Sequence, residues 1–205
     1  MTFELFSSDG PQVLVRGEID LSITPERYLS SQHPSERLFD DEYVCAVWSG
    51  NTQVKDHLSL EQYLSLGHIA VLYGRTRQVP FFDEWFHAHF EYRRRIDVIT
   101  TAFNLVPQLL IGTSRIATLH RRLATFYRRY LPLKLAAPPM ETPRLEEFMQ
   151  WHRSRERDPG TVWLRAVLKS ALSEEVSKEH PVARKIGGSP PTVIRKPRRN
   201  VVTHS

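Results

Sequence analysis

The side chains of this sequence that could do chemistry are two nearby histidines, one cysteine and a short acidic run. His87 and His89 are two residues apart in a helical pattern, so they lie on different faces and do not predict a metal site. The acidic run 40–42 is typical of a solvated turn, and Cys45, within YVCAVW, of a buried, unreactive thiol. Nucleophile-elbow, phosphate-loop and dinucleotide-binding motifs are missing. We therefore expect no enzyme, no metal and no cofactor.

Arginine clusters offer a second chemistry, contact with phosphate. One predicted helix carries Arg121, Arg122, Arg128 and Arg129, and a run covers 93–95. Both clusters favour a solvated surface; phosphate contact and an oligomer surface are the alternatives. The net charge is +5, but residues 176–205 contribute seven basic side chains and one acidic, which leaves −1 for the rest. We expect a nearly neutral folded part and a disordered basic tail whose nucleic-acid binding is weak and non-specific.

Composition narrows the class of protein. The chain has 205 residues, 40% of them hydrophobic, enough for one domain or two small ones. Its single cysteine excludes an internal disulfide framework. It contains neither an apolar run of about 20 residues nor a secretory signal pattern. We therefore expect a cytoplasmic protein without membrane contact.

Segments of period-two hydrophobicity alternate with segments of helical period. The predicted strands are 3–6, 19–23, 35–39, 42–48, 68–73, 96–100, 132–137 and 146–152. The predicted helices are 11–17, 58–64, 80–90, 104–111, 119–131 and 158–172. In the second of them, Ser59 is the predicted N-cap and Gln62 stands at the third helical position. The helix 119–131 is expected to turn Phe126 and Tyr130 inward, and the last helix to bury a stripe that includes Val162 and Trp163. Strands that alternate with helices predict a largely parallel sheet.

The segment after the first predicted helix is the most informative. Gly17 suits the left-handed position that ends a helix, and Asp20 and Ser22 alternate outward along the strand 19–23. A helix, then R-G-E-hydrophobic-D-hydrophobic, then an extended loop resembles the middle of the effector-binding domain in LysR-type transcriptional regulators. Further stretches are similar to the branch that regulates aromatic-compound degradation and nodulation: 39–51 (FDDEYVCAVWSGN), 58–75 (LSLEQYLSLGHIAVLYGR), 104–124 with 132–135, and 149–168.

This resemblance covers residues 3–172 and implies the α/β fold of type II periplasmic binding proteins. Two lobes are joined by two crossover strands, and a small molecule binds between them. The implied division is 1–45 plus 133–175 for the first lobe, 46–132 for the second and 176–205 for the tail. Full-length members begin with a winged helix-turn-helix, a linker helix and the first strand and helix of the first lobe. Their counterpart is expected to be missing here, which leaves the first lobe incomplete, its sheet edge open and the chain prone to associate.

The resemblance also points to loops at strand ends as the effector site, because free N–H groups there attract ligand oxygens. The predicted site residues are Gly74, Arg75, Thr100, Thr101, Phe103, Thr118, His120 and His152. Arg75 would pair with a carboxylate and Phe103 would stack on an aromatic ring, while Thr101 and His120 would bond a hydroxyl. The alternative is that Arg75 is a solvated loop charge and that Thr100 and Thr101 only cap a helix.

The sequence therefore predicts the effector-sensing domain of a LysR-type regulator. Its expected partner is a small effector, an aromatic carboxylate, which biases the relative arrangement of the lobes. Family members form dimers or tetramers and contact DNA through the N-terminal domain. Two alternatives stay open: a stand-alone protein that binds small carboxylates, and a fragment that hetero-oligomerises with intact regulators.

Overall fold

The computed structural model describes residues 10–55, 57–72 and 80–179. The chain divides after Ala166 into two compact units. The first unit contains both β-sheets, and the described part of the second is the remainder of the long helix α6 (Pro159–Glu179). No helix among the described residues combines the length and apolar character needed to cross a membrane.

The first sheet is antiparallel, with strand order β1-β8-β2. It consists of β1 (Leu21–Pro25), β2 (Ser35–Asp41) and β8 (Leu145–Trp151). The helix α1 (Gly10–Val15) precedes it, and the short helices η1 (Glu26–Tyr28) and η3 (Arg153–Arg155) follow β1 and β8. The buried Gln150 amide holds the β1–β2 connection, since it donates to the Ser30 carbonyl at 2.8 Å and accepts from the Ser30 N–H at 3.0 Å.

The second sheet is mixed, with strand order β5-β4-β6-β3-β7. Its strands are β3 (Tyr43–Trp48), β4 (Gly67–Val71), β5 (Arg95–Thr100), β6 (Ile116–His120) and β7 (Leu133–Ala136). β4 is parallel to β5 and β6, whereas β3 is antiparallel to β6 and β7. The predicted largely parallel sheet is therefore wrong. The chain passes between the two sheets twice, from β2 into β3 and from β7 into β8. In the sheet that it enters, each of β3 and β8 runs antiparallel to the strands with which it pairs.

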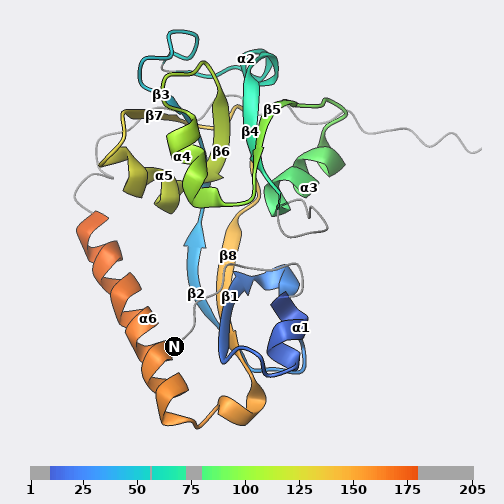
Figure 1. Cartoon of the computed structure of the whole chain (residues 1–205), viewed down its shortest axis with the longest axis vertical. Helices are drawn as coiled ribbons and strands as arrows, with labels where there is room; N and C mark the ends of the chain where they lie inside the picture. The colour runs from blue at the N-terminus through green and yellow to red at the C-terminus, as the bar shows by residue number, and fades with distance from the viewer. Residues whose placement is uncertain (1–9, 56, 73–79, 180–205) are drawn as a thin grey trace, which may run out of the picture. The chain divides into compact units, whose positions relative to one another are not determined.

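Helices cover both faces of the second sheet (Figure 1). On one face, α2 (Leu60–Ser65) and α3 (Phe81–His89) supply Tyr63, Phe82 and Phe86 to a core with Tyr43 and Ile116. On the other face lie η2 (Phe103–Leu105), α4 (Val106–Leu109) and α5 (Arg121–Arg128). Their Val106 and Ala124, with Leu110 directly after α4, pack against apolar side chains of β3, β4 and β6. The alternating side chains of β3 enter both cores, which explains why its run is apolar throughout.

The two sheets are joined twice. β2 passes into β3 with only Glu42 between them, and β7 leads to β8 through residues 137–144. β2 and β8 pair side by side in the first sheet, with Asp41 opposite Leu145 (Figure 1). This is the predicted two-lobe α/β fold with two crossover connections. The exact lobe boundaries, 1–45 with 133–175 and 46–132, stay a prediction.

Several local predictions were wrong. In β1, Thr24 is buried and Ile23 is 43% exposed, because Ile23 points into a pocket instead of a core. β6 is not among the predicted strands, and its last two residues, 119 and 120, fall in the predicted helix 119–131. That helix begins only at Arg121, and Phe126 and Tyr130 are exposed on it.

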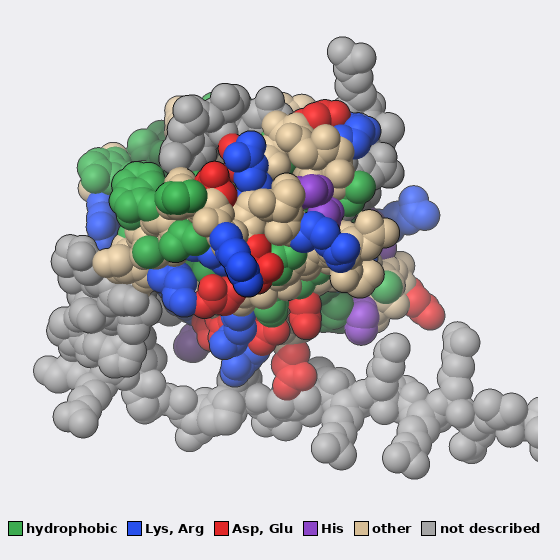
Figure 2. Space-filling view, turned by 90° about the horizontal axis from the view of Figure 1, so that it is seen from below, with side chains coloured by type: hydrophobic (Ala, Val, Ile, Leu, Met, Phe, Trp, Pro, Cys, Tyr) green, Lys and Arg blue, Asp and Glu red, His purple; other side chains and the backbone are tan. Residues whose placement is uncertain are grey.

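The last helix also differs from its prediction. Val162 and Trp163 are exposed, so the predicted stripe is not buried at these positions. The helix continues to Glu179, into the start of the segment predicted to be a disordered tail, whose remainder lies outside the described residues. On the face shown in Figure 2, basic and acidic side chains of the described part are interspersed, as expected for a folded part of nearly neutral charge.

The predicted cap of α2 is confirmed and gives a first test. The Ser59 hydroxyl accepts from the Gln62 N–H, and the Gln62 side chain accepts from the Ser59 N–H, both at 3.1 Å. Replacing Ser59 by alanine removes one of these bonds and is expected to lower the free energy of unfolding by about 1 kcal/mol in urea denaturation. The matched control is Ser114→Ala at an exposed position outside the helices. Equal losses in both variants would show that the cap contributes nothing.

Candidate functional site

A pocket of about 220 Å³ lies where the two sheets meet. The first sheet and its η1 helix contribute Ile23, Tyr28 and Glu147 to the lining. From the second sheet come the ends of β4 and β6, at Val71 and His120. These strands are parallel, so their carboxyl ends share one edge of the sheet, where binding sites of α/β proteins are usually found. The start of β3, at Tyr43, completes this edge.

Aromatic rings form one wall of the pocket. Tyr43 lies opposite His120 in the β3–β6 register, and their ring centroids are 5.2 Å apart. The Tyr43 ring also contacts Phe82 at 4.9 Å, and His120 contacts Phe103 at 5.3 Å. Burial lowers the pKa of His120 to about 4, so the imidazole is neutral at pH 7. This wall can therefore stack on a ring and offer one donor or acceptor nitrogen without a charge.

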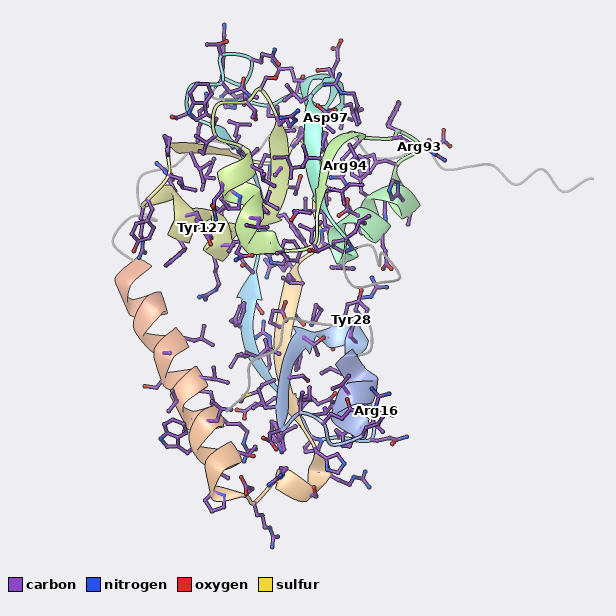
Figure 3. The ribbon with its side chains drawn as sticks, viewed as in Figure 1. Arg16, Tyr28, Arg93, Arg94, Asp97 and Tyr127 are labelled. Carbon is purple, nitrogen blue, oxygen red and sulfur yellow. The ribbon has the colours of Figure 1, made fainter. Side chains whose placement is uncertain are left out.

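A buried ion pair lies at a second wall. Arg94, just before β5, pairs with Asp83 in the first turn of α3, and their side chains are 3% and 13% exposed. The Arg94 guanidinium also lies over the rings of Phe82 and Phe86, at 5.3 and 5.2 Å. Figure 3 labels Arg94 between β5 and α3. Because each charge has an opposite partner, this wall is polar but carries no net charge.

A pair of carboxyl groups lies at the crossover. Asp41 is opposite Leu145, two residues from Glu147, so both acidic side chains are on the same face of the first sheet. Burial, with a smaller contribution from Asp41, raises the pKa of Glu147 to about 7. Burial also raises the pKa of Asp41, although the N–H groups of Glu42 and Arg122 donate to it and oppose this shift. Glu147 thus lines the pocket as a carboxyl group close to half protonation at neutral pH.

The comparison with protein families agrees with this architecture. Residues 2–173 match the model described as LysR substrate binding domain. The chain belongs to the LysR substrate binding domain family. It is 39% identical to Nodulation protein D 1 of Bradyrhizobium diazoefficiens over 187 residues, which cover 89% of this chain and 59% of that protein. It is 37% identical to Nodulation protein D 2 of Rhizobium leguminosarum bv. phaseoli over 183 residues, or 88% of this chain and 57% of that one.

These relatives are longer, and this chain spans somewhat more than half of their length. Solved structures support the fold. The regulatory domain of MexT from Pseudomonas aeruginosa superimposes with a TM-score of 0.65 at 23% identity, covering 78% of each chain. A putative transcriptional regulator from Vibrio parahaemolyticus gives 0.68 at 20% identity, covering 82% of this chain and 78% of that one. The predicted family and two-lobe fold are therefore confirmed.

In this LysR domain, the predicted effector residues are only partly brought together. Phe103, Thr118 and His120 line the pocket. Thr100 and Thr101 do not: the Thr100 hydroxyl accepts from the Ala102 N–H at 3.3 Å, Thr101 is exposed, and neither side chain caps η2. Gly74 and Arg75 lie outside the described residues.

His152 does not line this pocket. It follows β8 at the end of that strand away from Leu145, its ring lies tilted against that of His33 with centroids 4.7 Å apart, and it bonds the Ser154 hydroxyl at 2.7 Å. The prediction placed it at the pocket because it ends the last predicted strand, 146–152, in the first lobe. However, β8 enters the first sheet from the crossover, so its beginning approaches the pocket and its end does not.

Sequence reasoning missed several polar residues of this site: Tyr28, Tyr43, Asp83, Arg94 and Glu147. Arg94 was assigned to a solvated run, yet it is buried while its neighbours Arg93 and Arg95 are exposed. Its neighbours in the run are also arginines, so the sequence carries no signal that singles it out. In the described part of the chain, no cluster of three or more His, Cys, Asp or Glu side chains could hold a metal ion.

Proposed function

We propose that this chain is the effector-sensing part of a LysR-type transcriptional regulator and that the pocket between its sheets binds a small aromatic molecule. The observation that carries the proposal is that side chains from both sheets line one pocket of about 220 Å³ with an aromatic wall. An engineered apolar cavity of about 150 Å³ accommodates benzene. The pocket volume therefore suits one ring with a small substituent.

A ligand that contacts both sheets can act as a signal. It stabilises the arrangement of the lobes in which both sets of contacts form, and its differential affinity for two arrangements drives the switch. Regulation of transcription then requires a DNA-reading element in the whole protein, which the family supplies in its N-terminal domain. On this proposal the chain senses and does not catalyse. The names of the relatives, nodulation proteins D, and of the similar regulatory domains support a regulatory role.

A carboxylate on the ligand is the finer part of the proposal. Among the described lining residues, Arg94 is the arginine that could bind it, and it is paired with Asp83. A ligand carboxylate therefore competes with Asp83 for Arg94 or uses Arg75, which lies outside the described residues. Benzoate and its uncharged amide, benzamide, separate the contribution of the ring from that of the charge.

The test is a calorimetric or NMR titration of the purified chain with benzoate and benzamide. Ile23 lines the pocket and is 43% exposed, so Ile23→Trp fills the pocket mouth without entering the core. We expect this variant to weaken binding at least about tenfold through steric exclusion. Val15→Trp is the matched control, since Val15 is equally exposed and does not line the pocket.

Absence of binding for both compounds would contradict the proposed pocket and favour the alternative that the chain is a fragment that hetero-oligomerises with intact regulators. Equal loss in Ile23→Trp and Val15→Trp would also contradict it. Binding of benzamide as tight as that of benzoate would refute the carboxylate while leaving the aromatic site in place.

A further inference from the structure

We propose that Thr118 determines the specificity of the pocket: the buried Tyr63 hydroxyl donates to the Thr118 oxygen and leaves the Thr118 hydroxyl as a hydrogen-bond donor toward the pocket, so the ligand presents an acceptor oxygen to it. The class of ligand group is a carbonyl or carboxylate oxygen. The inference rests on the proposed function and specifies the polar group that its ligand carries. It derives from the direction of the hydrogen bonds behind the pocket wall.

The direction is set by the burial of Tyr63. The Tyr63 hydroxyl lies 2.8 Å from the Thr118 hydroxyl, at hydrogen-bond distance. Tyr63 is 0% exposed, so its own hydrogen requires an acceptor within the protein. Among the described residues Thr118 supplies that acceptor, so Tyr63 donates and Thr118 accepts.

The next step concerns the Thr118 hydrogen. Thr118 lies directly opposite Cys45 in the β3–β6 register. Because Thr118 already accepts from Tyr63, its hydrogen is available to the Cys45 sulfur or to the pocket that Thr118 lines. A thiol sulfur is a weak acceptor. A ligand oxygen replaces it with a stronger one, and the pocket becomes selective for an acceptor at this point.

The protonation state of Tyr63 maintains this order, because the order reverses only if the buried phenol hydrogen loses its acceptor. Burial raises the pKa of Tyr63 to about 12, so the phenol keeps its hydrogen throughout the neutral range.

The experiment uses two uncharged probes of similar shape, acetophenone and ethylbenzene, which differ in the carbonyl oxygen. We expect the whole chain to bind acetophenone about three- to tenfold more tightly, the range that one net hydrogen bond gives. In Thr118→Val the ratio is expected to fall to about one, with the affinity for ethylbenzene unchanged. Thr118→Ser keeps the hydroxyl and should retain the preference.

A spectroscopic measurement separates specificity from simple loss of packing. With carbonyl-13C acetophenone, a hydrogen-bond donor shifts the carbonyl resonance downfield. We expect this shift in the wild-type chain and in Thr118→Ser, and its absence in Thr118→Val. Tyr63→Phe removes the donor that orients Thr118, so both the shift and the affinity ratio should decrease although Thr118 is still present.

The outcomes also separate this inference from the proposed function. Ethylbenzene and acetophenone binding with equal affinity, with no downfield shift, would overturn the role of Thr118 and leave the aromatic pocket standing. Binding of neither probe would overturn both. If Thr118→Val also loses ethylbenzene, the carbonyl shift in wild type and in Tyr63→Phe decides. An equal shift in both overturns the orientation of Thr118 by Tyr63, and a smaller shift in Tyr63→Phe supports it.

Discussion

Replacement of Arg94 by methionine is expected to lower the free energy of unfolding by about 3–5 kcal/mol, the cost of breaking a buried ion pair from one side. The variant leaves the carboxylate of Asp83, which is 13% exposed, without its cation. It also removes the guanidinium from the rings of Phe82 and Phe86, in the core between α3 and the second sheet. Urea denaturation at pH 7 measures the loss.

Two further variants make this expectation specific. In the double variant Asp83→Leu with Arg94→Met, both charges are absent, and most of the lost stability should return. Arg95→Met is the matched control, because Arg95 is next in the chain, is 65% exposed and pairs with Asp97 at 3.1 Å. It should cost less than about 1 kcal/mol. An Arg94 variant no more destabilised than the Arg95 variant would show that burial of the pair has no consequence for stability.

Elements with a local cause could be predicted from the sequence. Gly17 adopts φ 70° at the end of α1, where its N–H donates to the Leu14 carbonyl at 2.9 Å, and a glycine suits this conformation by itself. The Ser59 capping box is likewise a property of neighbouring residues. The two crossover connections between the sheets have no local signal, and their prediction came from the family resemblance.

Elements that depend on distant contacts were less accessible. The strand 116–120 is short and continues directly into α5, so its pattern was read as part of a helix. The exposure of Ile23 follows from the pocket it lines, which exists only because the second sheet faces it. The period-two hydrophobic pattern identifies a strand, but it does not show which element of the fold packs against each face of that strand.

Only part of the candidate site could be predicted from the sequence. Phe103, Thr118 and His120 were predicted from the family resemblance, which points to loops at strand ends, and the structure brings them to one pocket. Arg94 was not predictable, because the run of three arginines gives no reason for the middle one to be buried. Its burial depends on Asp83 and two rings of α3, all supplied by a helix that precedes β5. Glu147 was missed for a similar reason, since β8 alone does not reveal the crossover.

The second large effect is expected at Glu147 and depends on pH. The pKa of this carboxyl group is raised to about 7 from its ordinary 4.5, so the folded state binds the proton more tightly than the unfolded state. Its stabilising contribution is fully present below pH 4.5 and is lost as the pH rises through 7. Glu147→Gln mimics the protonated group. It should be more stable than wild type by about 3 kcal/mol at pH 8 and by less than about 1 kcal/mol at pH 5, since each pKa unit is worth about 1.4 kcal/mol.

The difference between variant and wild type isolates this group from the buried histidines. Burial lowers the pKa of His68 and His120 to about 4, which gives a pH dependence of opposite sign, but it is common to both proteins and cancels. Glu146→Gln is the control, because Glu146 points to the other face of β8 and pairs with Arg37 at 3.4 Å. A gain for Glu147→Gln that is the same at pH 5 and pH 8 would mean that Glu147 is charged throughout. Asp41 and the pocket walls would then tolerate a second carboxylate, and proton release from the crossover would play no part in the stability of the fold.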